Sequence, residues 1–302
     1  MSRTGVLVLA HGTPARPEDI EDFYTRIRRG RPPTPVELAE LTRRYEAIGG
    51  LSPFAERTTV QVDGLRAALD AERFEVRLGQ KFVAPFIPDA VEDLIAADVD
   101  RIVGIVLAPH YAPPSVGDYT KRARDAIAER VPVDVIASWH NEPALIELLA
   151  ERVRDAWIDD AVLIVSAHSL PLAAIGDDTT YGDALEETAR LVARSLGVTN
   201  YRVAWQSAGV SGGAWLDPSL LETIREEAAE GATAVVVCAA GFVSDHLEIA
   251  YDLDIEAKAV ADEEGVAFAR TRSLDGDPAF CALLADLVTR AASGASSPPL
   301  VS

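Results

Sequence analysis

AVLIVSAHSLP, residues 161–171, combines the pattern of a buried strand with a histidine at its end. A short apolar run bounded by a turn with proline is typical of a strand covered on both faces. LVLAHGTP, residues 7–14, has the same order: an apolar run, a small residue, a histidine and a turn ending in proline. The two stretches therefore predict two similar α/β units, with His168 and His11 at the ends of corresponding strands.

Six further apolar runs have the same pattern of a buried strand. Helix-like stretches, such as residues 58–72 and 219–231, lie between the runs. This alternation predicts parallel sheets covered by helices on both faces. We expect an α/β protein with two Rossmann-like, doubly wound lobes, 1–145 and 146–302, and a cleft between them. The C-terminal SGASSPPLVS is expected to be a loose tail. Besides the strands within 5–10 and 161–168, strands are expected within 74–80, 101–109, 133–138, 201–207, 233–240 and 266–273.

Composition narrows the class of partner. The 302 residues contain 28 Lys and Arg against 48 Asp and Glu, a formal net charge of −20. A net negative charge of this size repels phosphate groups, so nucleic acids and anionic lipids are poor candidates for partners. The N-terminal apolar run is too short for a secretory signal or a membrane span, so we expect a cytoplasmic protein. Its two cysteines, Cys238 and Cys281, cannot supply the four thiolates usual for an iron–sulfur cluster.

Histidines follow several of the predicted strands. His11, His110 and His168 come directly after such runs, and His140 and His246 also follow strands. In open α/β sheets, ligands bind outside the carboxyl ends of the strands, and neutral imidazole can bind a transition metal or accept a proton. Taken alone, His168 is equally consistent with a histidine bonded to a backbone carbonyl. Several histidines from both halves favour a site in the cleft.

The stretch GFVSDHLEIAYDLDIEA, residues 241–257, is strongly acidic. Glu248, Asp252 and Glu256 recur every four residues, which on a helix places them on one face about one turn apart. Like charges at that spacing repel each other. With His246 near the start of the helix, the oxygen and imidazole groups suit a divalent first-row metal. The spacing predicts a metal path, and a solvated acidic face is the alternative.

Arginines cluster in an otherwise acidic chain. RIRRGR, residues 26–31, holds four of them, and TRRYEAIGGLSP, residues 42–53, adds two more. Arginine forks bind carboxylates and phosphates through paired hydrogen bonds. The cluster predicts a site for an anionic ligand, and the aromatic rings of Tyr45 and Tyr119 suit a flat one. A network of ion pairs at helix ends is the alternative.

These stretches together resemble the ferrochelatase family, whose members insert ferrous iron into a porphyrin. The resemblance covers nearly the whole chain, and RYEAIGG and SVGDYTKRA are similar to the soluble bacterial coproporphyrin III branch. It implies a two-lobed chelatase fold and a lyase activity in haem biosynthesis, with coproporphyrin III as substrate and coproheme as product. The motifs that carry it are GTPARPEDIEDFYTRIRRGRPP, RYEAIGGLSPFAERT, VAPFIPDAVEDL, LAPHYAPPSVGDYTKRA, SAHSLP and GFVSDHLEIAYDLDIEA.

The resemblance also implies roles for individual residues. His168 and Glu248 match the pair that faces the porphyrin centre and is implicated in iron binding and proton removal. Asp252 and Glu256 match the acidic residues that continue this metal path toward the surface. The positions that match porphyrin-contacting residues of the family are Arg28, Arg44, Tyr45, Ser52 and Tyr119.

His11 departs from the family pattern. The relatives closest in motif carry a tyrosine there, which can ligate the iron of the product. Imidazole can also ligate haem iron, so the ligand role is either retained with a new residue or lost. The resemblance further implies iron as a substrate, no tightly bound cofactor, a monomer, and transient contact with the next haem-pathway enzyme.

Three other functions compete with this interpretation. A protoporphyrin IX ferrochelatase or a cobalt or nickel tetrapyrrole chelatase would share the fold and the histidines. A non-catalytic haem or porphyrin carrier would hold iron on His11 without inserting it. The combined motifs weigh against the cobalt and nickel chelatases, and the paired His168 and Glu248 weigh against the carrier.

Overall fold

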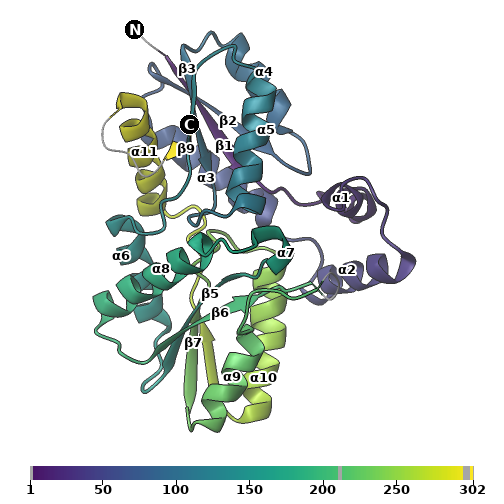
Figure 1. Ribbon diagram of the computed structural model, residues 1–302, viewed down its shortest axis with the longest axis vertical. Coiled ribbons are helices and arrows are strands. Elements are labelled where there is room, and N and C mark those ends of the chain that lie inside the picture. Colours follow the sequence, from purple (N-terminus) through teal and green to yellow (C-terminus); the bar gives the residue numbers. More distant parts are fainter. Residues whose placement is uncertain (1–2, 210–212, 295–299, 302) are drawn as a thin grey trace.

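The computed structural model describes residues 3–209, 213–294 and 300–301 of the chain, and its strands form two sheets (Figure 1). Every strand pair is parallel except the pair between β4 and β9. The first sheet has the order β2 (Phe74–Gln80), β1 (Thr4–Ala10), β3 (Arg101–Val106), β4 (Val133–Ile136) and β9 (Leu300–Val301). The second has the order β6 (Tyr201–Gln206), β5 (Val162–His168), β7 (Ala234–Cys238) and β8 (Ala267–Arg270).

All eight strands predicted from the sequence are confirmed. The expectation of a loose C-terminal tail is wrong for Leu300–Val301, because this segment pairs with β4 as β9. Hydrogen bonds to an open sheet edge satisfy backbone groups that a free tail would leave to water. Residues 295–299 and 302 of that tail lie outside the described residues.

Helices connect the strands, and several begin at the capping residues that the sequence provides. Thr34 and Glu37 form a reciprocal capping box at the start of α2, and the Ser219 hydroxyl accepts from the Glu222 N–H at the start of α9. The first half contains η1 (Pro17–Asp19), α1 (Ile20–Ile27), α2 (Pro35–Ala47), α3 (Phe54–Ala68), α4 (Ile87–Ala96), η2 (Pro113–Gly117) and α5 (Asp118–Ile127). The second contains α6 (Pro143–Ala156), α7 (Leu172–Ile175), α8 (Thr180–Leu196), α9 (Leu220–Ala229), η3 (Ile249–Ala257), α10 (Lys258–Glu264) and α11 (Pro278–Ser293).

Strand β1 shows why the sheets are covered on both faces. Its side chains are all buried, and alternate residues enter different cores. Val6 and Val8 face the core that holds residues of α3, α6 and α11, whereas Leu7 and Leu9 face residues of α4 and α5. A strand alternates its side chains across the sheet, so an unbroken apolar run requires helices on both sides. The predicted doubly wound architecture is confirmed.

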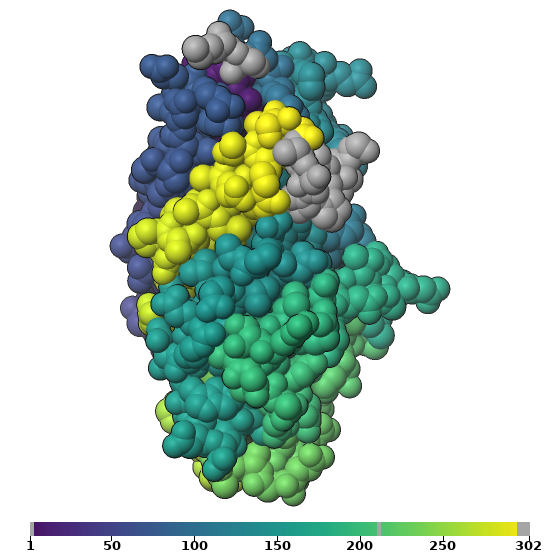
Figure 2. All heavy atoms as spheres, turned by 90° about the vertical axis from the view of Figure 1, so that its left-hand side faces the viewer, coloured from purple at the N-terminus to yellow at the C-terminus, as the bar shows by residue number. Residues whose placement is uncertain are grey.

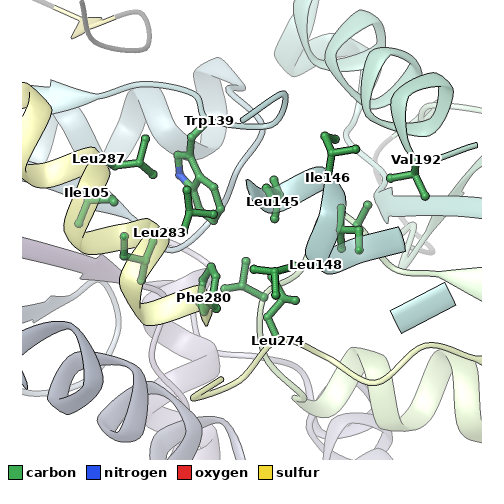
Figure 3. Close-up of a cluster of buried hydrophobic side chains, with 14 of the residues drawn as sticks. Ile105, Trp139, Leu145, Ile146, Leu148, Val192, Leu274, Phe280, Leu283 and Leu287 are labelled. Atoms are coloured by element: carbon green, nitrogen blue, oxygen red, sulfur yellow. The ribbon is translucent and has the colours of Figure 1, made fainter. Parts of the chain in front are cut away.

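One hydrophobic core continues from the first sheet to the second. Figure 3 shows its centre, where Trp139, Leu145 and Phe280 meet. Helix α11 packs against both α3 and α6, and Figure 2 shows it as the yellow band between the two halves. The division at residue 145 stays a prediction, since α11 and β9 return from the predicted second lobe to the first sheet.

Residues 14–50, which we call the arm, contain η1, α1 and α2 and stand beside the sheets (Figure 1). In α2, Tyr45 is the buried residue. Helix α1 also buries Ile20 and Phe23, and what these buried side chains of the arm touch matters for the site. Across the three described ranges of the chain, no helix has both the length and the apolar character needed to cross a membrane.

The junction between α6 and α11 contains a buried ion pair, and Asp277→Ala should lower the free energy of unfolding by about 3 kcal/mol. Arg152 is 4% exposed and pairs with Asp277, which also caps α11 by accepting from the Ala279 N–H at 2.8 Å. Removing the carboxylate leaves a buried charge without its partner. Urea unfolding of the purified protein measures the loss.

The matched control for that substitution is Asp155→Ala. It removes an exposed pair with Arg272, in which nitrogen and oxygen are 3.1 Å apart. Exposed pairs contribute little, so a change of less than about 0.5 kcal/mol is expected. Equal losses in the two variants would contradict the structural role of Asp277.

Candidate functional site

His168 is the last residue of β5, and the turn that follows it orients its ring. Its Nδ1 donates to the carbonyl oxygen of Ser169, so Nε2 faces Oε1 of Glu248 at 3.5 Å. Ser169 itself is fixed, because its N–H donates to Gln206 O and its hydroxyl to Leu216 O. His168 is thus bonded to a backbone carbonyl through Nδ1, as the alternative interpretation expected. Its Nε2 makes no backbone bond and is left to interact with Glu248.

Glu248 directly precedes η3 and lies between two imidazoles. Its Oε1 faces His168, and its Oε2 lies 3.4 Å from Nε2 of His246. The Nδ1 of His246 donates to the carbonyl oxygen of Ser244 at 3.0 Å, and its ring packs against Phe242 with 4.7 Å between centroids. Each backbone bond fixes a tautomer and directs the second nitrogen at the carboxylate.

The His168–Glu248 pair is ionised at neutral pH. Burial acts to lower the pKa of His168, but the charge of Glu248 outweighs it and raises the pKa to about 9. Burial also acts to raise the pKa of Glu248, but His168 and His246 hold it well below its ordinary value. Both side chains keep 35% of their surface accessible. The pair is therefore partly accessible and is not sealed in the core.

The acidic stretch forms a π-helix, η3, and the expectation of an ordinary helix there is corrected. A π-helix closes its hydrogen bonds from i to i+5, and such segments are frequent at functional sites. Residues four apart still lie about one turn apart. Burial and the charge of Glu248 raise the pKa of Asp252 to about 6, and Glu256 contributes to the same shift. The three carboxylates thus form a row along η3.

Asp252 is the buried middle member of this row, with a side chain only 7% exposed. Its Oδ2 accepts from the hydroxyl of Ser207, and Nη1 of Arg44 lies 3.5 Å from its Oδ1. In the described parts of the chain, no three His, Cys, Asp or Glu side chains gather closely enough to hold a metal ion. The predicted metal residues His168, Glu248, Asp252 and Glu256 therefore do not form one coordination sphere, and they stay candidates for successive positions on a path.

His11 follows β1 and lies near enough to Glu248 and His246 for their charges to act on it. Its ring packs against Phe82 with 4.7 Å between centroids, and its Nδ1 donates to Gly12 O at 3.0 Å. Neighbouring protein removes water from the His11 ring, and this desolvation lowers its pKa to about 4, although the bond to Gly12 and the charge of Glu248 act in the opposite direction. Since the imidazole is neutral at physiological pH, its Nε2 lone pair can ligate a metal.

Three predicted porphyrin-contacting residues are buried. Tyr45 is 3% exposed, its hydroxyl lies 3.4 Å from that of Thr13, and burial followed by Glu248 raises its pKa. Ser52 is 8% exposed and accepts from the Phe54 N–H. Tyr119 is 5% exposed, and burial raises its pKa. Of these three residues, Tyr45 is close enough to Glu248 for the charge of that carboxylate to act on its pKa.

The two predicted arginines belong to ion-pair networks. Nη1 of Arg28 lies 2.6 Å from Glu37 within the arm, so the structure does not bring Arg28 to the His168–Glu248 pair. Arg44 pairs with Glu40 at 3.1 Å and with Asp252. Both arginines thus have carboxylate partners near helix ends, and Arg44 in addition reaches the acidic row, while their contact with an anionic ligand stays a prediction.

A cavity of about 910 Å³ adjoins His11 through Phe82 and includes the Pro113–Gly117 turn and Ala174 of α7. Its cations stand out in a chain of net charge −20. Anionic groups are favoured in such a place. The basic residues that line it are Arg26, Arg29, Lys81, Lys121 and Arg122.

His110 and His140 do not join the site, which corrects the expectation that most of the histidines converge. Their rings stack on each other with 5.6 Å between centroids. Nε2 of His110 bonds the Thr188 hydroxyl at 2.9 Å, and Nε2 of His140 bonds Glu187 at 2.9 Å. Both partners lie on α8. These histidines therefore join the first half of the chain to the second.

Sequence reasoning left several neighbours of the site without a role. Lys81 follows β2 as His11 follows β1, so the strand-end rule was a usable signal for it. Tyr181 donates its hydroxyl to the carbonyl oxygen of His168 at 3.0 Å. Ser207 reaches Asp252, and Tyr251 of η3 reaches Arg43 on α2, through contacts that no local sequence pattern indicates.

The chain is similar to known proteins in family, in sequence and in fold. The family model described as ferrochelatase matches residues 3–292. The coproporphyrin III ferrochelatase of Oceanobacillus iheyensis is 40% identical, with 96% of this chain and 97% of the relative covered. The coproporphyrin III ferrochelatase of Anoxybacillus flavithermus is 42% identical, with 94% and 95% covered. The ferrochelatase of Herpetosiphon aurantiacus is 39% identical, with 95% and 99% covered.

Solved structures share the fold at much lower identity. The sirohydrochlorin chelatase SirB from Bacillus subtilis subspecies spizizenii, in complex with cobalt, has a TM-score of 0.61 and 12% identity, with 97% and 96% covered. CbiX, the terminal enzyme for siroheme biosynthesis in denitrifying bacteria, has a TM-score of 0.53 and 14% identity, with 95% and 99% covered. These likenesses confirm the two-lobed chelatase fold.

Proposed function

The chain belongs to the ferrochelatase family, and from this premise we propose that it inserts ferrous iron into coproporphyrin III to give coproheme. The activity is that of a metal chelatase of the lyase class in haem biosynthesis. Relatives at 40–42% identity over most of both chains carry this substrate in their names. The observation that carries the site is Glu248 held between Nε2 of His168 and Nε2 of His246.

The reaction removes two pyrrole N–H protons from the porphyrin and water from the iron. A planar ring presents its nitrogen lone pairs poorly, so bending it toward one face favours insertion, and remote binding energy can support that distortion. Such binding energy requires groups far from the ring centre. The cationic cavity beside His11 offers them to the four carboxylates of coproporphyrin, twice the number on protoporphyrin.

The His168–Glu248 pair changes role when iron arrives. The charge of Glu248 is what keeps His168 protonated. Once Fe²⁺ neutralises that carboxylate, burial and the metal charge both favour the neutral imidazole, so His168 releases its proton to water and can then accept one pyrrole proton. Metal–ligand distances are about 2 Å, so an ion between the two groups would need about 4 Å. Their 3.5 Å separation means that they part to admit iron, and the pair titrates as a unit.

His11 is suited to the opposite role. Because its pKa is lowered to about 4, it does not compete for the pyrrole protons at neutral pH. Its Nε2 can instead ligate the iron of the product, as tyrosine does in the relatives closest in motif. We assign Arg44 to a porphyrin carboxylate, and Tyr45, Ser52, Tyr119 and Arg28 to the walls that position the ring.

Iron reaches the pair along η3, in the order Glu256, Asp252, Glu248. Glu256→Gln should raise the iron concentration for half-maximal rate by about fivefold, since one charge near a cation in partly solvated protein contributes about 1 kcal/mol. The maximal rate should not change, because Glu256 lies at the outer end of the row. Initial rates at graded ferrous iron measure both values.

Asp254→Asn is the control for this prediction. Asp254 also lies on η3 and is exposed, but its Oδ1 pairs with Nε of Arg270 at 2.6 Å, away from the row. Its iron dependence should match that of the wild type. An unchanged iron dependence in Glu256→Gln would remove Glu256 from the path.

Other properties complete the proposal. Two cysteines, both buried and free, support an enzyme that needs no iron–sulfur cluster, with iron as substrate and not as resident cofactor. The net charge of −20 supports work in the cytoplasm away from anionic lipid. We propose that the enzyme is a monomer and that it contacts the next haem-pathway enzyme transiently.

The deciding experiment is anaerobic ferrous insertion by the purified protein, with coproporphyrin III and protoporphyrin IX compared side by side. We expect turnover with a strong preference for coproporphyrin. A preference for protoporphyrin would overturn the substrate, and faster insertion of cobalt or nickel than of iron would overturn the metal. Stoichiometric haem binding without turnover would identify a carrier.

A further inference from the structure

Tyr251 joins the arm to the acidic row, two regions far apart in the chain. It lies on η3 beside Asp252 and is only 4% exposed. Its hydroxyl accepts from Nη2 of Arg43 on α2 at 2.6 Å. Since Tyr45 is the buried residue of α2, this contact is a large part of what holds the end of that helix against η3.

The ring of Tyr251 also lies under two guanidinium groups. The guanidinium carbons of Arg43 and Arg44 are 5.4 Å and 4.7 Å from the ring centroid. A cation over a buried aromatic face is held in place by the quadrupole of the ring, and the planar guanidinium stacks well. The stack therefore restricts where Arg44 can point.

As the structure stands, Arg44 points at the acidic row. Its Nη1 lies 3.5 Å from Asp252, and its Nε lies 3.1 Å from Glu40. Within the described residues, the Asp252 side chain accepts a hydrogen bond only from Ser207, on Oδ2, and Oδ1 has no hydrogen-bond partner beside the ion pair with Arg44. A guanidinium charge at this place competes with a ferrous ion for the middle carboxylate.

Resting on the function proposed above, we propose that Tyr251 is a positioning residue that holds Arg44 between two anions, Asp252 of the iron path and a carboxylate of the porphyrin. The stack keeps the guanidinium ready for the porphyrin carboxylate, and it also keeps a positive charge beside Asp252. When the porphyrin takes Arg44, Asp252 becomes free for iron. Porphyrin binding therefore prepares the iron path.

This arrangement predicts opposite effects on the two substrates. Tyr251→Leu removes the stack, so Arg44 leaves Asp252 more often, and the iron concentration for half-maximal rate should fall. The same freedom makes Arg44 less ready for the porphyrin, so the dissociation constant of coproporphyrin III should rise. Each change should be about threefold to tenfold. A merely destabilised protein has no reason to bind one substrate better and the other worse.

The experiment measures initial rates at graded iron and the fluorescence quenching of coproporphyrin III on binding. Two milder variants separate the contacts: Tyr251→Phe removes only the Arg43 bond, and Arg43→Gln keeps the ring under Arg44. Both should shift the two constants in the same directions as Tyr251→Leu, by less. They also test the proposal if the leucine variant does not fold.

Phe74→Leu is the matched control. Phe74 is 6% exposed and carries Arg73 over its ring at 5.4 Å, but it lies at the start of β2, away from the row. It should lose stability and leave both substrate constants unchanged. If the two constants of the Tyr251 variants are unchanged, or both move in the same direction, the proposal is overturned. The proposed function still stands in that case, provided that Glu248→Gln abolishes insertion. If Glu248→Gln retained full activity, the failure would lie in the proposed function.

Discussion

His168→Ala should lower the rate of iron insertion by about 10³-fold, the loss expected when a positioned proton acceptor is removed. Nε2 of the imidazole lies 3.5 Å from Oε1 of Glu248, and the backbone bond from Nδ1 to Ser169 directs Nε2 at that carboxylate. Alanine leaves β5 intact, because the strand is held by its neighbours β6 and β7 and not by the ring. Single-turnover insertion under anaerobic conditions measures the rate, and fluorescence titration should show unchanged coproporphyrin affinity.

The control for this substitution is another imidazole–carboxylate pair. Nε2 of His140 lies 2.9 Å from Glu187, but the pair joins the first half of the chain to α8 and does not reach Glu248. His140→Ala should therefore insert iron at the wild-type rate. Near-normal turnover in His168→Ala would remove His168 from the chemistry, and equal losses in the two variants would point to a general effect of folding.

The strands and the strand-end histidines of this site were predictable because they depend on local patterns. An apolar run of β-branched residues has few alternatives to a buried strand, and parallel strands bring their carboxyl ends to one edge. His168 and His11 follow from that rule, and Glu248 from the acidic stretch after β7. The resemblance to a known family added the pairing of His168 with Glu248, which spacing alone could not give.

What the sequence did not reveal depends on contacts over long distances. Spacing by four indicated a helix for residues 248–256, but that spacing does not distinguish a π-helix from an α-helix. The return of α11 to the first sheet lacks a local signal, because its apolar face would suit either half. From the sequence, Tyr251 is an ordinary aromatic residue of the core. Its contact with Arg43, 208 residues away in the chain, appears only in the folded structure.

Glu248→Gln should abolish insertion, with a loss at least as large as that of His168→Ala, and it should change His168 in a way that activity does not report. The charge of Glu248 and its hydrogen bond are what raise the pKa of His168 to about 9 against the effect of burial. Without the charge, burial dominates, and the pKa should fall below the ordinary value of about 6.5. NMR titration of the ring nitrogens measures this shift in the folded protein.

Glu187→Gln is the control for that titration, since it neutralises the partner of His140 and should leave the pKa of His168 near 9. The unfolding free energy provides a second test. Between the unfolded pKa of about 6.5 and the folded value of about 9, the native wild type binds a proton that the unfolded chain lacks, so its stability falls as the pH rises through this window. Glu248 is ionised in both states over this range and adds no slope. Glu248→Gln should lack the fall that His168 causes, and a variant whose His168 still titrates near 9 would show that another group holds the proton.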